Sequence, residues 1–134
     1  ERHASNYYNG ITVGIDFTAR DIQDELKKKG LPWEKAKAFD NSAAVGKFID
    51  LTPASNRKNI NFTFYKNKEL VQTGNSANMI FSIDSIIAHI SNYFSLNIGD
   101  LIFTGTPAGV GECVVGDLLE AFLEKENLLT VEVK

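Results

Sequence analysis

Apolar and polar positions alternate in several short runs of this chain, and turn-forming residues separate the runs. Residues 11–15 alternate and are rich in β-branched side chains, which predicts a strand that ends at Asp16. Residues 60–65 alternate again, and the polar turn at 66–68 can lead them back into residues 69–72 as a β-hairpin.

Three apolar segments in the second half of the chain also have the character of strands. Residues 117–123 and 128–133 predict two strands, and residues 101–104 predict a buried strand that runs into the glycine-rich loop 105–111. Together with the first runs, these segments make strands the commonest element.

Two segments have helical spacing instead. Residues 18–29 begin with Thr18 and Asp21, which resemble a capping box, and end before Gly30. Residues 82–94 begin with Ser82 as the N-cap. Each segment carries an apolar stripe: Ala19, Ile22 and Leu26 in the first, and Ile83, Ile86, Ile87, Ile90 and Phe94 in the second. Because strands outnumber helices without a regular βαβ alternation, we expect an α+β, mainly β fold in a single domain.

The composition is that of a globular protein with a small negative charge. Hydrophobic residues make up 43% of the 134 residues and the net charge is −3, which argues against disorder and against a nucleic-acid partner. The apolar runs are far shorter than the roughly 20 residues that span a bilayer, so we expect no membrane association. The single Cys113 and the lack of a signal segment favour a cytoplasmic protein.

The best candidate for chemistry is the junction between the first strand and the first helix. Asp16 ends the strand, and Arg20 and Gln23 lie three positions apart on one helix face. A carboxylate, a guanidinium and an amide at one place suit a metal ion and an anionic ligand. Alternatively, Asp16 only caps the helix or pairs with Arg20, and the spacing leaves both interpretations open.

Two further candidates are a lysine and a loop. Lys37 is flanked by Trp33 and Phe39, which would bury its ammonium and lower its pKa, as catalytic lysines require; a solvated lysine is the alternative. The loop 105–111 lacks a phosphate-loop motif, yet its backbone N–H groups and the Thr106 hydroxyl suit a carboxylate. A tight turn between strands is the alternative.

Four ordered stretches of the chain carry a family resemblance. They are residues 14–24, 29–39, 79–83 and 99–111. In this order they resemble the fumarylacetoacetate hydrolase family, and the similarity extends from about Tyr8 to the end of the chain. The most similar members are short, single-domain acylpyruvases, so the resemblance implies a mixed β-roll with two main helices.

The resemblance also assigns roles to the candidate residues. It implies that Asp16 is one ligand of a Mg²⁺ or Mn²⁺ ion, that Lys37 is the active-site lysine, and that Arg20 and Gln23 line the substrate pocket. It implies further that Thr106 contacts the substrate carboxylate. The family's other metal ligands form a Glu-x-Glu pair upstream of Asp16, and the residues of this sequence that precede Asp16 contain no Glu-x-Glu. We therefore expect residues 1–134 to be an N-terminally incomplete catalytic domain that is inactive alone, and we expect a homodimer.

The function implied by the resemblance is metal-dependent hydrolysis of a carbon–carbon bond. The substrates would be 3-acylpyruvate or fumarylpyruvate-type β-diketo acids, cleaved through a pyruvate enolate. Alternatives within the family are decarboxylation or tautomerisation of oxaloacetate and isomerisation of unsaturated keto acids. A non-catalytic carboxylate-binding module is the alternative of another class. The expected partner is a small keto acid in each enzymatic case.

Overall fold

The computed structural model describes residues 3–52, 55 and 58–134. The chain divides into a large unit, Glu1–Val13 with Gly46–Lys134, and a small unit, Gly14–Val45. The expected α+β class, with more strands than helices, is confirmed. Among the described residues, no helix is long and apolar enough to cross a membrane.

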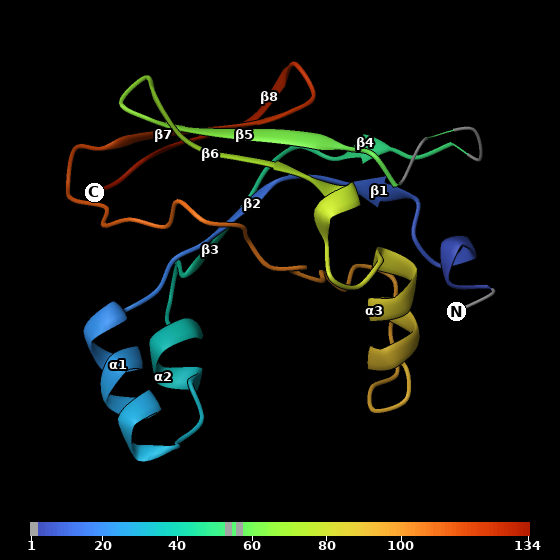
Figure 1. Cartoon of the computed structure of the whole chain (residues 1–134), viewed down its shortest axis with the longest axis horizontal. Helices are drawn as coiled ribbons and strands as arrows, with labels where there is room; N and C mark the ends of the chain where they lie inside the picture. The colour runs from blue at the N-terminus through green and yellow to red at the C-terminus, as the bar shows by residue number, and fades with distance from the viewer. Residues whose placement is uncertain (1–2, 53–54, 56–57) are drawn as a thin grey trace. The chain divides into compact units, whose positions relative to one another are not determined.

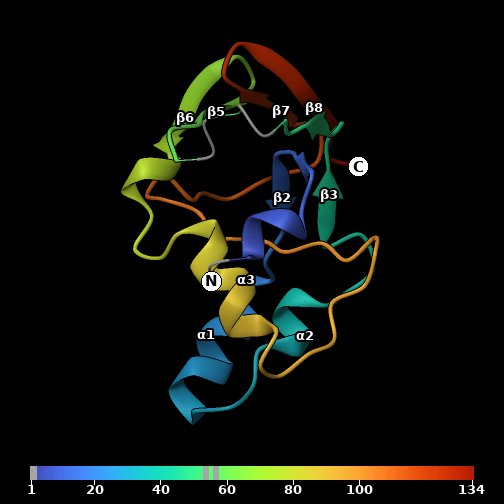
Figure 2. The ribbon, with the colours of Figure 1, turned by 90° about the vertical axis from the view of Figure 1, so that its right-hand side faces the viewer.

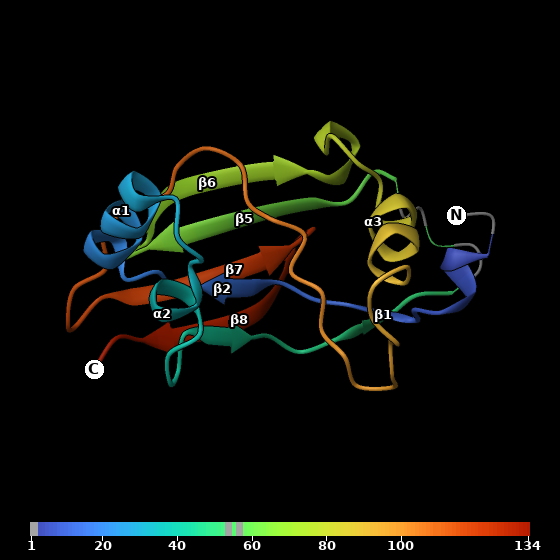
Figure 3. The same cartoon turned by 90° about the horizontal axis from the view of Figure 1, so that it is seen from below.

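The large unit is built on an antiparallel sheet of four strands, seen side by side in Figure 3. Its strand order is β6-β5-β7-β8, formed by Glu69–Asn75, Asn61–Lys66, Leu118–Leu123 and Glu126–Glu132. The predicted hairpin is confirmed as β5 and β6. Asn67 and Lys68 connect the two strands with φ angles of 52° and 70°, the left-handed pair that matches strand twist in a tight hairpin.

The core of the large unit lies on one face of this sheet. Alternate residues of β7 are buried, as a two-residue period dictates, and Leu119 is fully buried. A short ladder of β1 (Gly10–Ile11) and β4 (Ile49–Asp50) contributes Ile11 and Ile49 to the core. The cluster consists of Val13, Ala121, Leu123 and Leu128, with Ile11, Ile49, Ile60, Phe62, Phe64 and Leu129 packed against it.

Helix α3 (Ile83–Ile90) begins as predicted but ends earlier than residue 94. The Ser82 hydroxyl accepts a hydrogen bond from Ser85 N at 3.1 Å, which confirms the N-cap. After Ile90 the chain continues in tighter turns, in which Tyr93 N donates to Ile90 O at 2.9 Å. Phe94, the last residue of the predicted apolar stripe, is 69% exposed. Single 3-10 turns, η1 (Ala4–Asn6) and η2 (Ser76–Asn78), complete the helical elements described in this unit.

The prediction of a strand at residues 101–104 is wrong. This segment has no strand, and Leu101 and Phe103 are 52% and 45% exposed. An apolar run becomes a strand only where a neighbouring strand offers backbone partners, and the four-stranded sheet is formed without it. The predicted strand at 11–15 is also divided, because β1 ends at Ile11 and β2 (Gly14–Asp16) pairs with a different partner.

The small unit consists of a two-stranded ladder and two helices, which lie side by side in Figures 1 and 2. Strand β2 pairs antiparallel with β3 (Ala43–Val45), and the helices are α1 (Arg20–Lys29) and α2 (Glu34–Lys37). Helix α1 ends as predicted at Gly30, whose φ of 64° is a left-handed conformation that glycine adopts without strain.

The predicted start of α1 needs two corrections. The N-cap is Ala19 rather than Thr18, and no side chain caps the helix, because the Thr18 hydroxyl is bonded elsewhere. The predicted apolar stripe is not the buried face either: Ile22 is 40% exposed, whereas Gln23 is 3% exposed. A polar side chain is therefore the most buried group of this helix.

Candidate functional site

Asp16 ends strand β2, and backbone pairing holds it in place. It lies opposite Ala43 in the β2–β3 ladder, and the next residue, Phe17, donates its N–H to Ser42 O at 2.7 Å. The Asp16 side chain is 49% exposed. The strand end thus presents a carboxylate that is fixed through its backbone and open to small molecules.

Lys37 forms the centre of the polar cluster in the small unit. It is the last residue of α2, and its Nζ donates to Asp16 Oδ2 at 2.7 Å and to Thr18 Oγ1 at 2.8 Å. The lysine side chain is 32% exposed, so the ammonium is held by two oxygens while part of it stays accessible. We name these three residues, Asp16, Thr18 and Lys37, the ammonium cluster.

Trp33 and Phe39 do not bury Lys37, and burial was one of the two interpretations that the sequence left open. Their exposed fractions are 43% and 41%, and the Lys27 ammonium lies over the Trp33 ring at 5.2 Å from the ring centre. The position of Lys37 is set by its polar partners and by the backbone of α2, where Ala36 O accepts from Ala19 N at 3.0 Å. A fixed charge, rather than a buried one, is what this structure provides.

Arg20 and Gln23 share a helix face, as their spacing predicts. Arg20 Nη1 donates to Gln23 Oε1 at 2.6 Å, and the buried amide therefore fixes the direction of the guanidinium. Asp16 pairs with Lys37 rather than with Arg20, so the alternative in which Asp16 and Arg20 neutralise each other is not what forms. The remaining Arg20 donors suit a carboxylate or another anion.

Thr106 lies in the large unit, in a loop held against β6. Gln72 Nε2 donates to Thr106 Oγ1 at 2.9 Å, to Pro107 O at 3.2 Å and to Ala108 O at 3.4 Å. Gly109 has a φ of 104°, and a side chain there would run into the Val71 carbonyl. The loop is therefore an ordered turn that presents a hydroxyl.

Sequence reasoning missed Thr18 and Gln72. Thr18 was assigned to a capping box, and the pattern gives no sign that a lysine 19 positions later uses its hydroxyl. Gln72 is one of several polar residues of an alternating strand, and its partners lie 34 to 36 positions away. Neither contact has a local sequence signal.

The described residues do not by themselves form a divalent cation site. Asp16 is a suitable oxygen donor, but it is engaged by Lys37, and the described part of the chain has no group of three or more His, Cys, Asp or Glu side chains. A divalent cation such as Mg²⁺ takes about six oxygen ligands, which in addition balance its charge. The chemistry below is therefore derived from the protein's own side chains.

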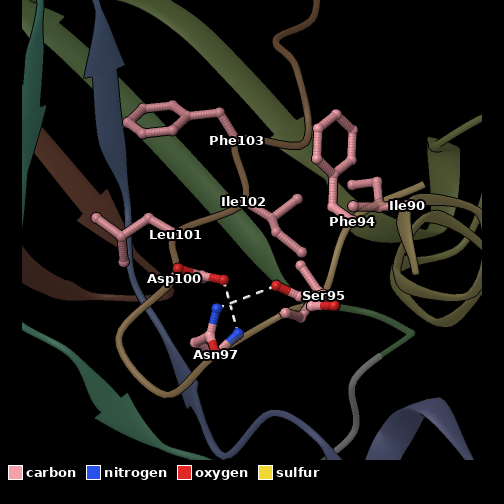
Figure 4. Close-up of a pocket in the computed structure, with 9 residues that line it drawn as sticks. Ile90, Phe94, Ser95, Asn97, Asp100, Leu101, Ile102 and Phe103 are labelled. Atoms are coloured by element: carbon pink, nitrogen blue, oxygen red, sulfur yellow. Dashed lines mark hydrogen bonds between the residues drawn. The ribbon is translucent and has the colours of Figure 1, made fainter. Parts of the chain in front are cut away.

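A separate open cavity of about 560 Å³ lies in the large unit, between the end of α3 and the segment that follows (Figure 4). Its polar groups bond to one another: Asn97 N donates to Asp100 Oδ2 at 2.7 Å, and Asn97 Nδ2 donates to Ser95 O at 3.0 Å. The other side chains that line it are apolar. The cavity contains none of the predicted site residues.

Comparison with known proteins identifies the family. The model of the fumarylacetoacetate hydrolase C-terminal domain matches residues 1–134. The chain belongs to the fumarylacetoacetate hydrolase family. The resemblance seen in the four ordered motifs is thereby confirmed.

Relatives of known function within this family include oxaloacetate tautomerases. The mitochondrial oxaloacetate tautomerase of Homo sapiens is 40% identical over 134 residues, which is 100% of this chain and 61% of that protein. The oxaloacetate tautomerase of Escherichia coli K12 is 40% identical over 131 residues, 97% of this chain and 60% of that protein. The chain thus spans about three fifths of the length of these relatives.

Solved structures of the family share the fold. A fumarylpyruvate hydrolase from Pseudomonas aeruginosa, in complex with Mn²⁺ and pyruvate, matches with a TM-score of 0.92 and 32% identity over 98% of this chain and 57% of that one. A 5-carboxymethyl-2-hydroxymuconate delta-isomerase from Mycobacterium smegmatis matches with a TM-score of 0.85 and 27% identity, over 98% of this chain and 50% of that one.

Proposed function

We propose that the full-length protein interconverts the keto and enol forms of oxaloacetate, with Lys37 stabilising the charge that develops on the substrate oxygen. The observation that carries this proposal is the fixed ammonium of Lys37, held at 2.7 Å and 2.8 Å by two oxygens. The 40% identity to the tautomerases of Homo sapiens and Escherichia coli supports the choice of substrate. It favours tautomerisation over the hydrolysis expected from the motifs.

The proposed chemistry is a proton transfer through an enolate. Transfer of a proton from carbon 3 of the keto form to a water molecule leaves negative charge on the oxygen of carbon 2, and return of a proton from the resulting hydronium ion to that oxygen gives the enol. A fixed ammonium beside the oxygen of carbon 2 stabilises the enolate oxygen more than the uncharged carbonyl oxygen of the keto form, which is the requirement for lowering the barrier. Arg20, oriented by Gln23, is proposed to bind a substrate carboxylate.

Replacement of Lys37 tests this role. Lys37→Met removes the ammonium and keeps a chain of similar length, so kcat for tautomerisation is expected to fall by about 10²- to 10³-fold. The assay follows the loss of enol absorbance in the full-length protein. Lys35→Met is the matched control, because Lys35 is an exposed lysine of the same helix. A near-normal rate in Lys37→Met would exclude the proposed role.

Hydrolysis of fumarylpyruvate is the second candidate function. It is favoured by the Pseudomonas aeruginosa neighbour, and it also releases a pyruvate enolate that the same ammonium can stabilise. Pyruvate release from fumarylpyruvate distinguishes it from tautomerisation. A protein active in neither assay that still binds oxalate would be the non-catalytic carboxylate-binding module.

Finer features of the proposal come from the motif resemblance. They are dependence on Mg²⁺ or Mn²⁺, contact of Thr106 with the substrate carboxylate, a homodimer and a cytoplasmic location. The solved complex of the Pseudomonas aeruginosa relative with Mn²⁺ supports a divalent metal in the full-length protein. Light scattering of the full-length protein measures its oligomeric state directly.

A further inference from the structure

We propose that Thr18 is a positioning residue that directs the Lys37 ammonium toward the substrate oxygen. The inference rests on the proposed function of Lys37, and it adds a residue that the family motifs did not single out. The inference is based on the 2.8 Å hydrogen bond from Lys37 Nζ to Thr18 Oγ1. Thr18 makes this contact and does not cap the N-terminus of α1.

Two of the three N–H donors of the Lys37 ammonium are already engaged. An ammonium has three N–H bonds, and in this structure one is donated to Asp16 Oδ2 and one to Thr18 Oγ1. One N–H is then left for a substrate oxygen. Two fixed acceptors determine the direction of the third donor, whereas a single acceptor would leave the group free to rotate about that bond.

Asp16 alone holds the Lys37 ammonium weakly. Its side chain is 49% exposed, and exposed ion pairs contribute little stabilisation because water screens the charges. The Thr18 hydroxyl is neutral, so it orients the ammonium without neutralising the charge that the enolate needs. A carboxylate and a hydroxyl thus have separate effects on the same ammonium.

Hydrogen bonds hold Thr18 itself in place. Its hydroxyl donates weakly to the Asp16 carbonyl at 3.4 Å, which leaves its lone pairs directed toward Lys37. Between Asp16 and Thr18, the Phe17 N–H donates to Ser42 O at 2.7 Å and fixes the backbone. Directly after Thr18, Ala19 N donates to Ala36 O at 3.0 Å, and Ala36 directly precedes Lys37. Backbone bonds therefore set the distance between hydroxyl and ammonium.

The experiment compares Thr18→Val with Thr18→Ser in the full-length protein. Valine has nearly the shape of threonine but no hydroxyl, so kcat for tautomerisation is expected to fall, by up to about a hundredfold, while KM changes much less. Serine restores the hydroxyl and should recover kcat toward the unsubstituted rate. Thr73→Val, at an exposed position of β6, is the control for a threonine-to-valine change. Thr18→Ala provides a smaller second variant if valine disturbs the fold.

A second readout needs neither substrate nor activity. The ¹³Cε signal of Lys37, assigned by its loss in Lys37→Met, reports the surroundings of the ammonium. We expect this signal to move in Thr18→Val and to stay near its original position in Thr18→Ser. An unmoved signal in Thr18→Val overturns the inference, as does a Thr18→Ser variant as slow as Thr18→Val, because the serine hydroxyl would then fail to replace the threonine hydroxyl.

The outcomes separate this inference from the proposed function. If Lys37→Met is inactive and Thr18→Val keeps the full rate, the function stands and the positioning role of Thr18 is wrong. If Lys37→Met keeps its activity, the role proposed for Lys37 is wrong, and the positioning role of Thr18 is overturned with it. Loss of kcat in both variants, with rescue by serine, supports both.

Discussion

Lys37 and Asp117 are each held by an opposite charge, but their surroundings differ. Lys37 is partly accessible and pairs with a half-exposed carboxylate, which suits a group that must meet a substrate. Asp117 is 5% exposed and accepts hydrogen bonds from Val114 N at 2.9 Å and from Asn67 Nδ2 at 2.7 Å, with Lys66 Nζ at 3.7 Å. Asp117 therefore has a structural role just before β7.

This difference leads to a prediction about pH. The Val114 N–H and then the Asn67 amide hold the pKa of Asp117 below its usual value, and Lys66 contributes in the same direction. Because the folded-state pKa is the lower one, the carboxylate stabilises the fold above the unfolded-state pKa. That contribution disappears as the pH falls through the folded-state pKa.

The measurement is Tm as a function of pH for the unsubstituted protein and for Asp117→Asn. The variant is expected to melt at a lower temperature at pH 7, and the difference should shrink as the pH falls below about 4. Glu69→Gln, which removes an exposed carboxylate at the start of β6, is the control. A difference in Tm that stays constant into strong acid would contradict the role of the Asp117 charge.

At the scale of elements, β7 forms the centre of the large unit. It pairs with β5 on one side and β8 on the other, and its alternate residues are buried. A central strand of this kind contributes to stability through the side chains on its buried face.

Truncation of one buried side chain tests this view. Leu119→Ala is expected to lower the free energy of unfolding by about 2–5 kcal/mol, because Leu119 is fully buried and its removal leaves a cavity. Leu70→Ala on β6 is the matched control, since Leu70 is 55% exposed, and a change within about 0.5 kcal/mol is expected. Urea unfolding of the full-length protein measures both, and equal effects would contradict the assigned core.

At the scale of the whole molecule, the chain corresponds to only part of the length of its relatives. It spans about three fifths of the length of the tautomerases that it matches. Within its described residues, Asp16 is one carboxylate without two further ligands beside it.

Cation binding can be measured in the full-length protein. Mn²⁺ together with oxalate, a mimic of the pyruvate enolate, is expected to raise Tm, and a ligand at a hundredfold its Kd stabilises by about 2.7 kcal/mol. Asp16→Asn is expected to lose this shift, whereas Asp40→Asn, at an exposed position of the small unit, should keep it. An unsubstituted protein that shows no shift would contradict a metal-assisted keto-acid site.

Local signals determined the features that depend on neighbours in sequence. The hairpin of β5 and β6, the Ser82 cap and the left-handed Gly30 were all predictable, because each depends on residues within a few positions of one another. The shared face of Arg20 and Gln23 was predictable for the same reason. The family could also be identified, since its motifs are runs of neighbouring residues.

Tertiary structure decided what depends on distant partners. Residues 101–104 are as apolar as a strand, but they do not pair with any strand of the described sheets. The sequence also predicted a Thr18 cap and left burial and solvation of Lys37 open, whereas the fold brings these two side chains together with Asp16. Hydrogen bonds between groups about 20 positions apart depend on the backbone pairing that holds both ends in place. Periodicity determined the elements of this protein, and their packing determined which polar groups meet.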